Sequence, residues 1–220
     1  VGSEMCIRDS YERKQVPSSL VPYDKKYFWP LLYFKGFYQS ERFFADMADD
    51  IRKAFTFNPS LSNRKTKEMS EQIDHDENAV SIHVRRGDYL EPKYWKTTGC
   101  VCQLPYYLNA IAEMNKRISQ PSYYVFSDDI AWVKENLPLP KVFFIDWNKG
   151  TESWQDMMLM SRCRHHIICN STFSWWGAWL NPRENKTVIM PERWFRHCET
   201  PDICPDKWIK VPINQPDSIQ

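Results

Sequence analysis

The segment AVSIHVRRGD, residues 79–88, decides the fold. Its first six residues resemble a buried strand, and charged residues follow at once. Four similar runs come later, separated by segments with helical spacing of apolar residues. The strand-like runs are YYVF (123–126), KVFFI (141–145), HHIIC (165–169) and TVIM (187–190), and the helical segments are 105–119, 130–137, 152–162 and 173–180. This alternation predicts an α/β fold with a parallel sheet, because parallel neighbours need crossover connections.

The sequence before residue 79 is less regular. Apolar residues at helical spacing predict one amphipathic helix over residues 41–55. Residues 29–40 predict a short strand and turn, and the polar residues 58–78 predict a linker or a loosely attached helix. We therefore divide the chain into residues 1–78 and 79–220.

Composition argues against several classes of protein. The 220 residues carry a formal net charge of +1, so no basic field predicts nucleic-acid binding. No long apolar run predicts a transmembrane helix, and the opening VGSEMCIRDS lacks the apolar core of a signal peptide. Seven cysteines, an odd number, favour reduced thiols. We expect a cytoplasmic protein and leave peripheral membrane attachment open.

Cysteines near His197 raise the question of a zinc site. They form two pairs, Cys100 with Cys102 and Cys198 with Cys204. Neither pair has the gap of about two to four residues that zinc sites use. We expect loop thiols and no bound metal.

Three polar clusters directly follow strand-like runs, where parallel sheets bind ligands. The first is His83 to Tyr89, in which Arg85 and Arg86 are adjacent and Gly87 allows a tight turn. Arginine grips phosphate with two parallel hydrogen bonds, so the pair predicts a diphosphate clamp. The alternative is a network of Arg–Asp salt bridges that holds a loop.

The second cluster is Ser127, Asp128 and Asp129, after the run YYVF. A carboxylate there would accept hydrogen bonds from a guanine edge or a ribose hydroxyl. Serine and aspartate are also ordinary N-caps, here for a helix beginning at Ile130, so capping alone is the alternative.

The third cluster follows HHIIC and opens a helix: Asn170, Ser171, Thr172 and Ser174. Hydroxyl groups and free backbone N–H groups at a helix N-terminus favour an anion, and capping is again the alternative. We interpret the tryptophans of this helix, Trp175, Trp176 and Trp179, as packing residues rather than sugar platforms.

Taken together, HVRRGDY (83–89), YVFSDD (124–129) and DMMLMSRCRHHIICNSTFSWWGAWLN (156–181) resemble three sequence blocks of the bacterial α-1,2-fucosyltransferases, glycosyltransferase family 11. The stretch GFYQSERFFADMADDIRKAF (36–55) is also similar, so the likeness covers about residues 29–194. The glycine-rich GGLGNQ-type opening of that family has no counterpart here. We therefore expect a fragment, and we interpret VGSEMCIRDS as a foreign junction.

The resemblance implies a GT-B-like arrangement of two α/β lobes, here a Rossmann-like donor-binding domain with an incomplete N-terminal lobe. It implies inverting transfer of L-fucose from GDP-fucose to the 2-hydroxyl of a galactoside, on a free oligosaccharide or a lipid-linked glycan, without a metal ion. In this scheme Arg85, Arg86 and the helix start at Ser171 to Ser174 would neutralise departing GDP. Asp88 is the candidate general base, with His83, Glu91 or a residue of the missing portion as alternatives.

Three rival functions remain. Asp74-His75-Asp76 formally offers the Asp-x-Asp pair of a metal-dependent GT-A transferase, although it lies in polar sequence ahead of a strand. A module that binds GDP-sugar or glycan without turnover is the second. The third, a flavin or nicotinamide oxidoreductase, lacks a G-x-G-x-x-G motif after any strand.

Overall fold

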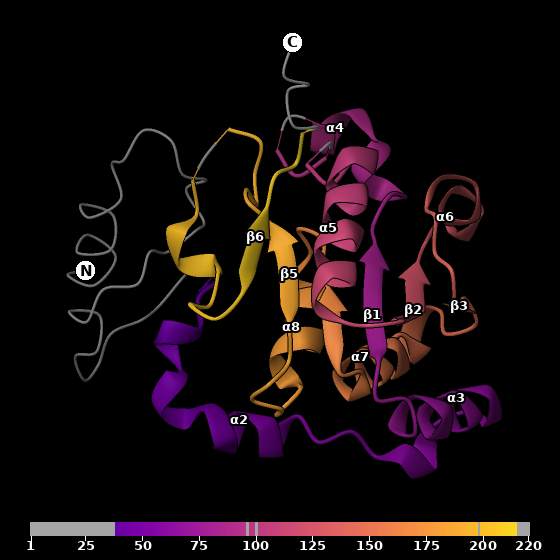
Figure 1. The fold of residues 1–220 in the computed structure, drawn as a ribbon. Coiled ribbons are helices and arrows are strands. Elements are labelled where there is room, and N and C mark those ends of the chain that lie inside the picture. The colour runs from indigo at the N-terminus through magenta and orange to yellow at the C-terminus, as the bar shows by residue number, and fades with distance from the viewer. Residues whose placement is uncertain (1–37, 96, 100, 198, 215–220) are drawn as a thin grey trace.

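A six-stranded parallel sheet forms the centre of the protein (Figure 1). The computed structural model describes residues 38–214 apart from 96, 100 and 198. The strands are β1 (Ala79–Val84), β2 (Ser122–Ser127), β3 (Val142–Ile145), β4 (His165–Ile167), β5 (Val188–Pro191) and β6 (Ile209–Val211). The first five confirm the predicted runs. The sixth was not predicted, because three residues split by Lys210 give too short a pattern.

The strand order β3-β2-β1-β4-β5-β6 places β1 at the centre of the sheet. The chain runs outward from β1 through β2 to β3, then returns to form β4 on the other side of β1. The connections after β1 and β4 therefore leave in opposite directions. In open α/β sheets ligands bind at such a reversal, outside the carboxyl ends of the strands.

Helices cover both faces of the sheet, and the alternation of side chains along β1 explains the two cores. Val80, Ile82 and Val84 pack with helices α5 (Leu104–Arg117) and α6 (Ile130–Asn136). On the opposite face, Ala79 of β1 and Phe126 of β2 pack with α3 (Arg64–Asp74) and α7 (Trp154–Arg162). The four helices predicted between strands are confirmed, and the fourth is α8 (Thr172–Leu180). The remaining short elements are η2 (Glu41–Phe43), η3 (Ala45–Met47), α2 (Ala48–Ala54), η4 (Pro59–Leu61), η5 (Asp88–Leu90), α4 (Pro92–Trp95), η6 (Gly150–Glu152) and η7 (Pro201–Ile203).

The single helix predicted over residues 41–55 is wrong in its first half. The two turns η2 and η3 come before α2, and Phe44 between them has non-helical angles, φ −142° and ψ 15°. The ring of Phe44 stacks on Trp176 at 5.5 Å and meets Trp179 edge-on at 5.2 Å. Packing on the tryptophans of α8 thus accompanies the break, and it confirms Trp176 and Trp179 as packing residues.

Residues 58–78 are not a loose linker. Asn63 caps α3 by accepting a hydrogen bond from the backbone N–H of Thr66 at 2.9 Å, and its side-chain amide donates to Asn148 Oδ1 at 2.8 Å. Thr66 and Ile73 are fully buried. The helix is therefore fixed against α7, although the division at residue 78 stays a prediction. Residues 29–37 of the predicted strand and turn lie outside the described residues.

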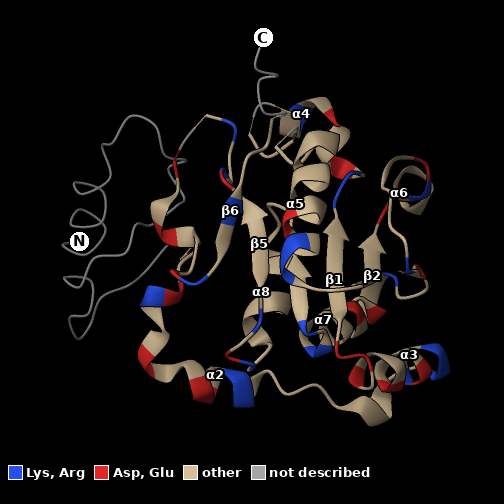
Figure 2. Cartoon of the chain, viewed as in Figure 1, with Lys and Arg blue, Asp and Glu red and all other residues tan. Residues whose placement is uncertain are grey.

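Charges of both signs are mixed along the described elements, for example on α2 and α3 (Figure 2). This agrees with the nearly neutral formal charge of the chain. Among the described residues, no helix combines the length and apolar character needed to cross a membrane.

Candidate functional site

A cavity of about 570 Å³ opens at the carboxyl edge of the sheet, where the strand order reverses. Its size suits a small-molecule ligand. Residues at or just after the ends of four different strands line it: Arg85 and Asp88 after β1, Ser127 and Asp128 at the end of β2, Asn148 after β3, and Ser171 after β4. Residues from all three predicted polar clusters thus meet at one cavity.

Arg85 presents its guanidinium to this cavity. Its Nε donates to Asp88 Oδ1 at 2.8 Å and lies 3.5 Å from Asp128 Oδ2. No acceptor within the described part of the chain pairs with its two terminal amino groups. The two carboxylates therefore orient the guanidinium and leave its outer edge free for a ligand.

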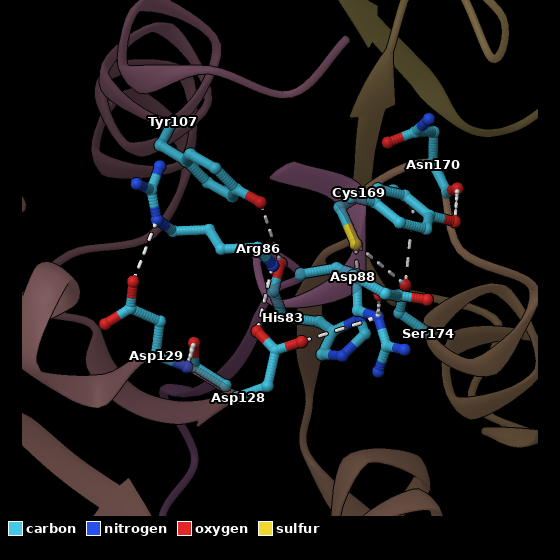
Figure 3. A network of polar contacts seen from close by, with 12 residues as sticks. His83, Arg86, Asp88, Tyr107, Asp128, Asp129, Cys169, Asn170 and Ser174 are labelled. Atoms are coloured by element: carbon cyan, nitrogen blue, oxygen red, sulfur yellow. Dashed lines mark hydrogen bonds and ion pairs between the residues drawn. The ribbon is translucent and has the colours of Figure 1, made fainter. Parts of the chain in front are cut away.

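Arg86 does not join Arg85. Its Nε donates to Asp129 Oδ2 at 3.1 Å, and its guanidinium carbon lies 4.1 Å from the centre of the Trp132 ring. Figure 3 shows the side chain turned towards Asp129 and away from His83. Consecutive residues of extended chain point to opposite sides, so two adjacent arginines after a strand diverge. The structure does not form the predicted two-arginine clamp and places Arg86 in the salt-bridge network that was its alternative.

The side chains of the second cluster also point in different directions. Asp129 caps α6 by accepting from the backbone N–H of Trp132 at 3.1 Å, and Ser127 Oγ accepts from the backbone N–H of Asp129 at 2.9 Å. Asp128 instead faces the cavity, and its Oδ1 accepts from the backbone N–H of Arg86 at 2.9 Å. A methyl group on Gly87 would lie 2.8 Å from Asp128 Oδ2, so any other residue at this position would have to displace that carboxylate.

In the third cluster, only Ser171 lines the cavity. Ser174 is buried and donates to the carbonyl of Ser171 at 3.1 Å, and Thr172 faces a separate, smaller pocket. Asn170 donates to the carbonyls of Thr98 and Trp194. Ser171 precedes the first turn of α8 and makes no side-chain capping bond, so its hydroxyl and the helix N-terminus are available to an anion.

His83 lines the cavity with its ring largely buried. Its Nδ1 lies 3.2 Å from Cys169 Sγ. Burial, aided by the charge of Arg85, lowers the pKa of His83 to about 3. An imidazole with this pKa is a poor proton acceptor near neutral pH, which disfavours His83 as the general base.

Asp156 of α7 also lines the cavity, and we did not select it from the sequence. Its Oδ1 accepts a hydrogen bond from Asn148 Nδ2 at 2.8 Å. Burial raises the pKa of Asp156 to about 7, although the bond from Asn148 opposes the rise. The sequence did hold one signal for Asp156. It lies in the first turn of the helix after the third strand, and that turn lies at the carboxyl edge of the sheet, where ligands bind.

The metal-binding alternatives find no support in the geometry. Asp74-His75-Asp76 precedes β1 and so lies at the amino edge of the sheet, opposite the cavity. Asp74 pairs with Arg162, and Asp76 accepts from Tyr124 at 3.0 Å. Cys100 and Cys198 lie outside the described residues. Among the described residues, no cluster of three or more potential metal ligands occurs.

Comparison with known proteins gives matches over most of the chain. The model of the family described as Glycosyl transferase family 11 matches residues 11–211. An Alpha-1,2-colitosyltransferase of Escherichia coli is 37% identical over 182 residues, which are 81% of this chain and 62% of that protein. The O-antigen biosynthesis glycosyltransferase WbnK of the same species is 33% identical over 80% of this chain and 59% of its own length.

A Galactoside alpha-(1,2)-fucosyltransferase 1 of Leontocebus fuscicollis is 31% identical over 69% of this chain and 43% of its own length. The chain thus spans 43–62% of the length of these relatives. With the family match over nearly the whole sequence, the chain belongs to glycosyl transferase family 11.

Proposed function

We propose that this chain is the donor-binding part of an α-1,2-fucosyltransferase, which transfers L-fucose from GDP-fucose to the 2-hydroxyl of a galactoside with inversion. One observation carries the proposal: Arg85 and Ser171 line the same cavity at the reversal of the strand order. The names of the relatives support α-1,2 transfer of a sugar.

The pyrophosphate would lie between Arg85 and the start of α8. The free edge of the guanidinium can donate two parallel hydrogen bonds to phosphate oxygens. On the other side, the hydroxyl of Ser171 and the N-terminal dipole of α8 favour negative charge. These groups would stabilise the charge that develops on departing GDP, so we propose that transfer needs no metal ion.

The nucleotide base would lie towards Asp156 and Asn148. A guanine edge carries adjacent N–H donors, which a carboxylate accepts in pairs. Uracil offers a single N–H between two carbonyl groups and would leave one carboxylate oxygen unpaired. This end of the cavity therefore favours a guanine nucleotide over a uracil nucleotide.

Asp88 remains the proposed general base. Its carboxylate faces the cavity beside Arg85, where the bond to GDP would break. The acceptor hydroxyl would lose its proton to Asp88 as its oxygen forms the new bond to fucose, while the electron pair of the old bond leaves with GDP. An oxocarbenium-like transition state would link the two events.

Compartment and acceptor belong to the same proposal. Cys102, Cys163, Cys169 and Cys204 are free thiols, which supports a reducing compartment such as the cytoplasm. The acceptor would be a galactoside on an oligosaccharide or a lipid-linked glycan.

A thermal-shift panel tests the donor. GDP, GDP-fucose and GDP-colitose should raise the melting temperature of the chain, and UDP-galactose should not. A ligand at 100 times its Kd stabilises the folded form by about 2.7 kcal/mol. Equal stabilisation by UDP-galactose, or none by any GDP compound, would refute the proposal. GDP-colitose is included because one relative is named a colitosyltransferase.

A transfer assay separates the enzyme from a binding module. This chain, joined to the part of a relative that it does not span, is incubated with radiolabelled GDP-fucose and a β-galactoside in excess chelator. Transfer is expected, and binding of GDP without transfer would favour the module. Transfer that the chelator abolishes would instead refute the metal-free mechanism.

A further inference from the structure

We propose that the Cys169 thiol is a positioning residue, which donates its hydrogen to Nδ1 of His83 and so holds the Nε2–H of that ring towards the donor cavity. The contact joins the second residue after β4 to a residue of β1, across the reversal of the strand order. The identity of the ligand rests on the proposed function, whereas the state of the ring does not.

The contact has the geometry of a hydrogen bond in a closed environment. Cys169 Sγ lies 3.2 Å from His83 Nδ1, and Cys169 is fully buried (Figure 3). Phe173 packs against the imidazole with 5.7 Å between ring centres. Tyr107 donates to the backbone carbonyl of His83 at 3.4 Å, which holds the strand end in place.

The direction of the bond follows from the protons that each group carries. Burial raises the pKa of Cys169 to about 12, so the sulfur keeps its hydrogen, and the neutral imidazole of His83 has one bare nitrogen. Ser174 Oγ is the competing partner, but it lies farther from the sulfur, at 3.8 Å, and can direct its own hydrogen to the carbonyl of Ser171 at 3.1 Å. An imidazole nitrogen accepts a hydrogen bond more strongly than a thiol sulfur does, so at 3.2 Å we infer that the thiol hydrogen points to Nδ1 and that the ring hydrogen lies on Nε2.

Nε2 has no hydrogen-bond partner in the described portion of the chain, and the ring lines the cavity. A nitrogen fixed in its N–H form can donate but cannot accept. It would therefore meet an oxygen acceptor of the bound nucleoside diphosphate. Without the thiol, the neutral ring would be free to move its hydrogen to Nδ1 or to flip, and the donor would be lost for part of the time.

The test compares three variants of the whole chain. Cys169→Ala removes the thiol, Cys169→Ser keeps a hydrogen-bond donor, and Cys163→Ala is the matched control, because Cys163 is also fully buried but donates to the carbonyl of Leu159. The ring nitrogens of His83 are read by long-range ¹H–¹⁵N NMR in the absence of ligand. The affinity for GDP is measured by calorimetry.

We expect one tautomer, with hydrogen on Nε2, in the wild type, the serine variant and the control, and a mixture in Cys169→Ala. The affinity for GDP should fall about three- to tenfold in Cys169→Ala and stay nearer the wild-type value in Cys169→Ser and Cys163→Ala, as for the loss of one hydrogen bond. An unchanged single tautomer in Cys169→Ala, or hydrogen on Nδ1 in the wild type, would overturn the inference. If GDP fails to bind the wild type, the proposed function fails, and the NMR result alone decides the role of Cys169.

Discussion

Replacing Asp156 with asparagine tests the electrostatics of the base end of the cavity. The change keeps the shape of the side chain and an oxygen that can accept from Asn148, and it removes the charge. Because burial raises the pKa of Asp156 from 3.8 to about 7, folding disfavours its charged form. The wild type should therefore lose stability as the pH rises from about 4 to about 7, and the variant should not lose this part.

The magnitude follows from the distance between the two pKa values, which is roughly three pH units. Each unit corresponds to about 1.4 kcal/mol, so the upper limit at pH 8 is about 4 kcal/mol. Asp156 is only partly buried, and water screens part of the effect. We expect the free energy of unfolding of Asp156→Asn, relative to the wild type, to rise by about 2 kcal/mol between pH 4 and pH 8.

Urea unfolding at several pH values measures this difference. Asp206→Asn serves as the control, because its side chain is 91% exposed and its 3.7 Å contact with Arg42 is a surface ion pair of little energy. Its stability relative to the wild type should stay nearly flat over the same range. A flat difference for Asp156→Asn as well would refute the reasoning about its environment. The same variant should also bind GDP more weakly at pH 8, where the wild type offers a carboxylate to the base.

Four further substitutions test the rest of the site and the packing of α7 on α8. Arg85→Lys removes the planar guanidinium that faces the cavity and should weaken GDP binding about 10- to 100-fold in calorimetry. Arg86→Lys should change the affinity for GDP less than about threefold. Equal losses would contradict the assignment of phosphate binding to Arg85 alone. Asp88→Asn should lower kcat for fucose transfer at least about 100-fold with a much smaller loss of GDP affinity, and an unchanged kcat would exclude Asp88 as the base. Gly177→Ala would place a methyl group 2.9 Å from Met160 Cβ and should destabilise the chain by about 1–3 kcal/mol in urea unfolding. An unchanged urea midpoint would show that α7 and α8 can move apart without loss of stability.

The sheet was predictable because its strands are short apolar runs of fixed length between helices. The same pattern could not show the order of the strands, nor the three-residue β6, whose middle residue is Lys210. It also misjudged residues 41–55, where helical spacing describes the apolar residues but Phe44 leaves the helix to stack on Trp176. Contacts between distant segments decide such cases, and one sequence does not contain them in readable form.

The site was predictable to the level of loops rather than side chains. Placement after strands brought Arg85, Asp128 and Ser171 to one cavity. The direction of each side chain depends on its neighbours, so the sequence could not show that Arg86 turns to Asp129. Asp156 was missed because its elevated pKa arises from burial, which no local motif encodes.

Because the cavity opens where the strand order reverses, its walls come from different stretches of the chain. The proposed phosphate end is lined by the segments after β1 and β4, whereas the proposed base end is lined by residues 148–156, a different stretch of the chain. Exchanges within that stretch would alter which nucleotide fits while the anion-holding groups stay in place. Evolution could therefore change the choice of nucleotide base without disturbing the groups that bind the pyrophosphate.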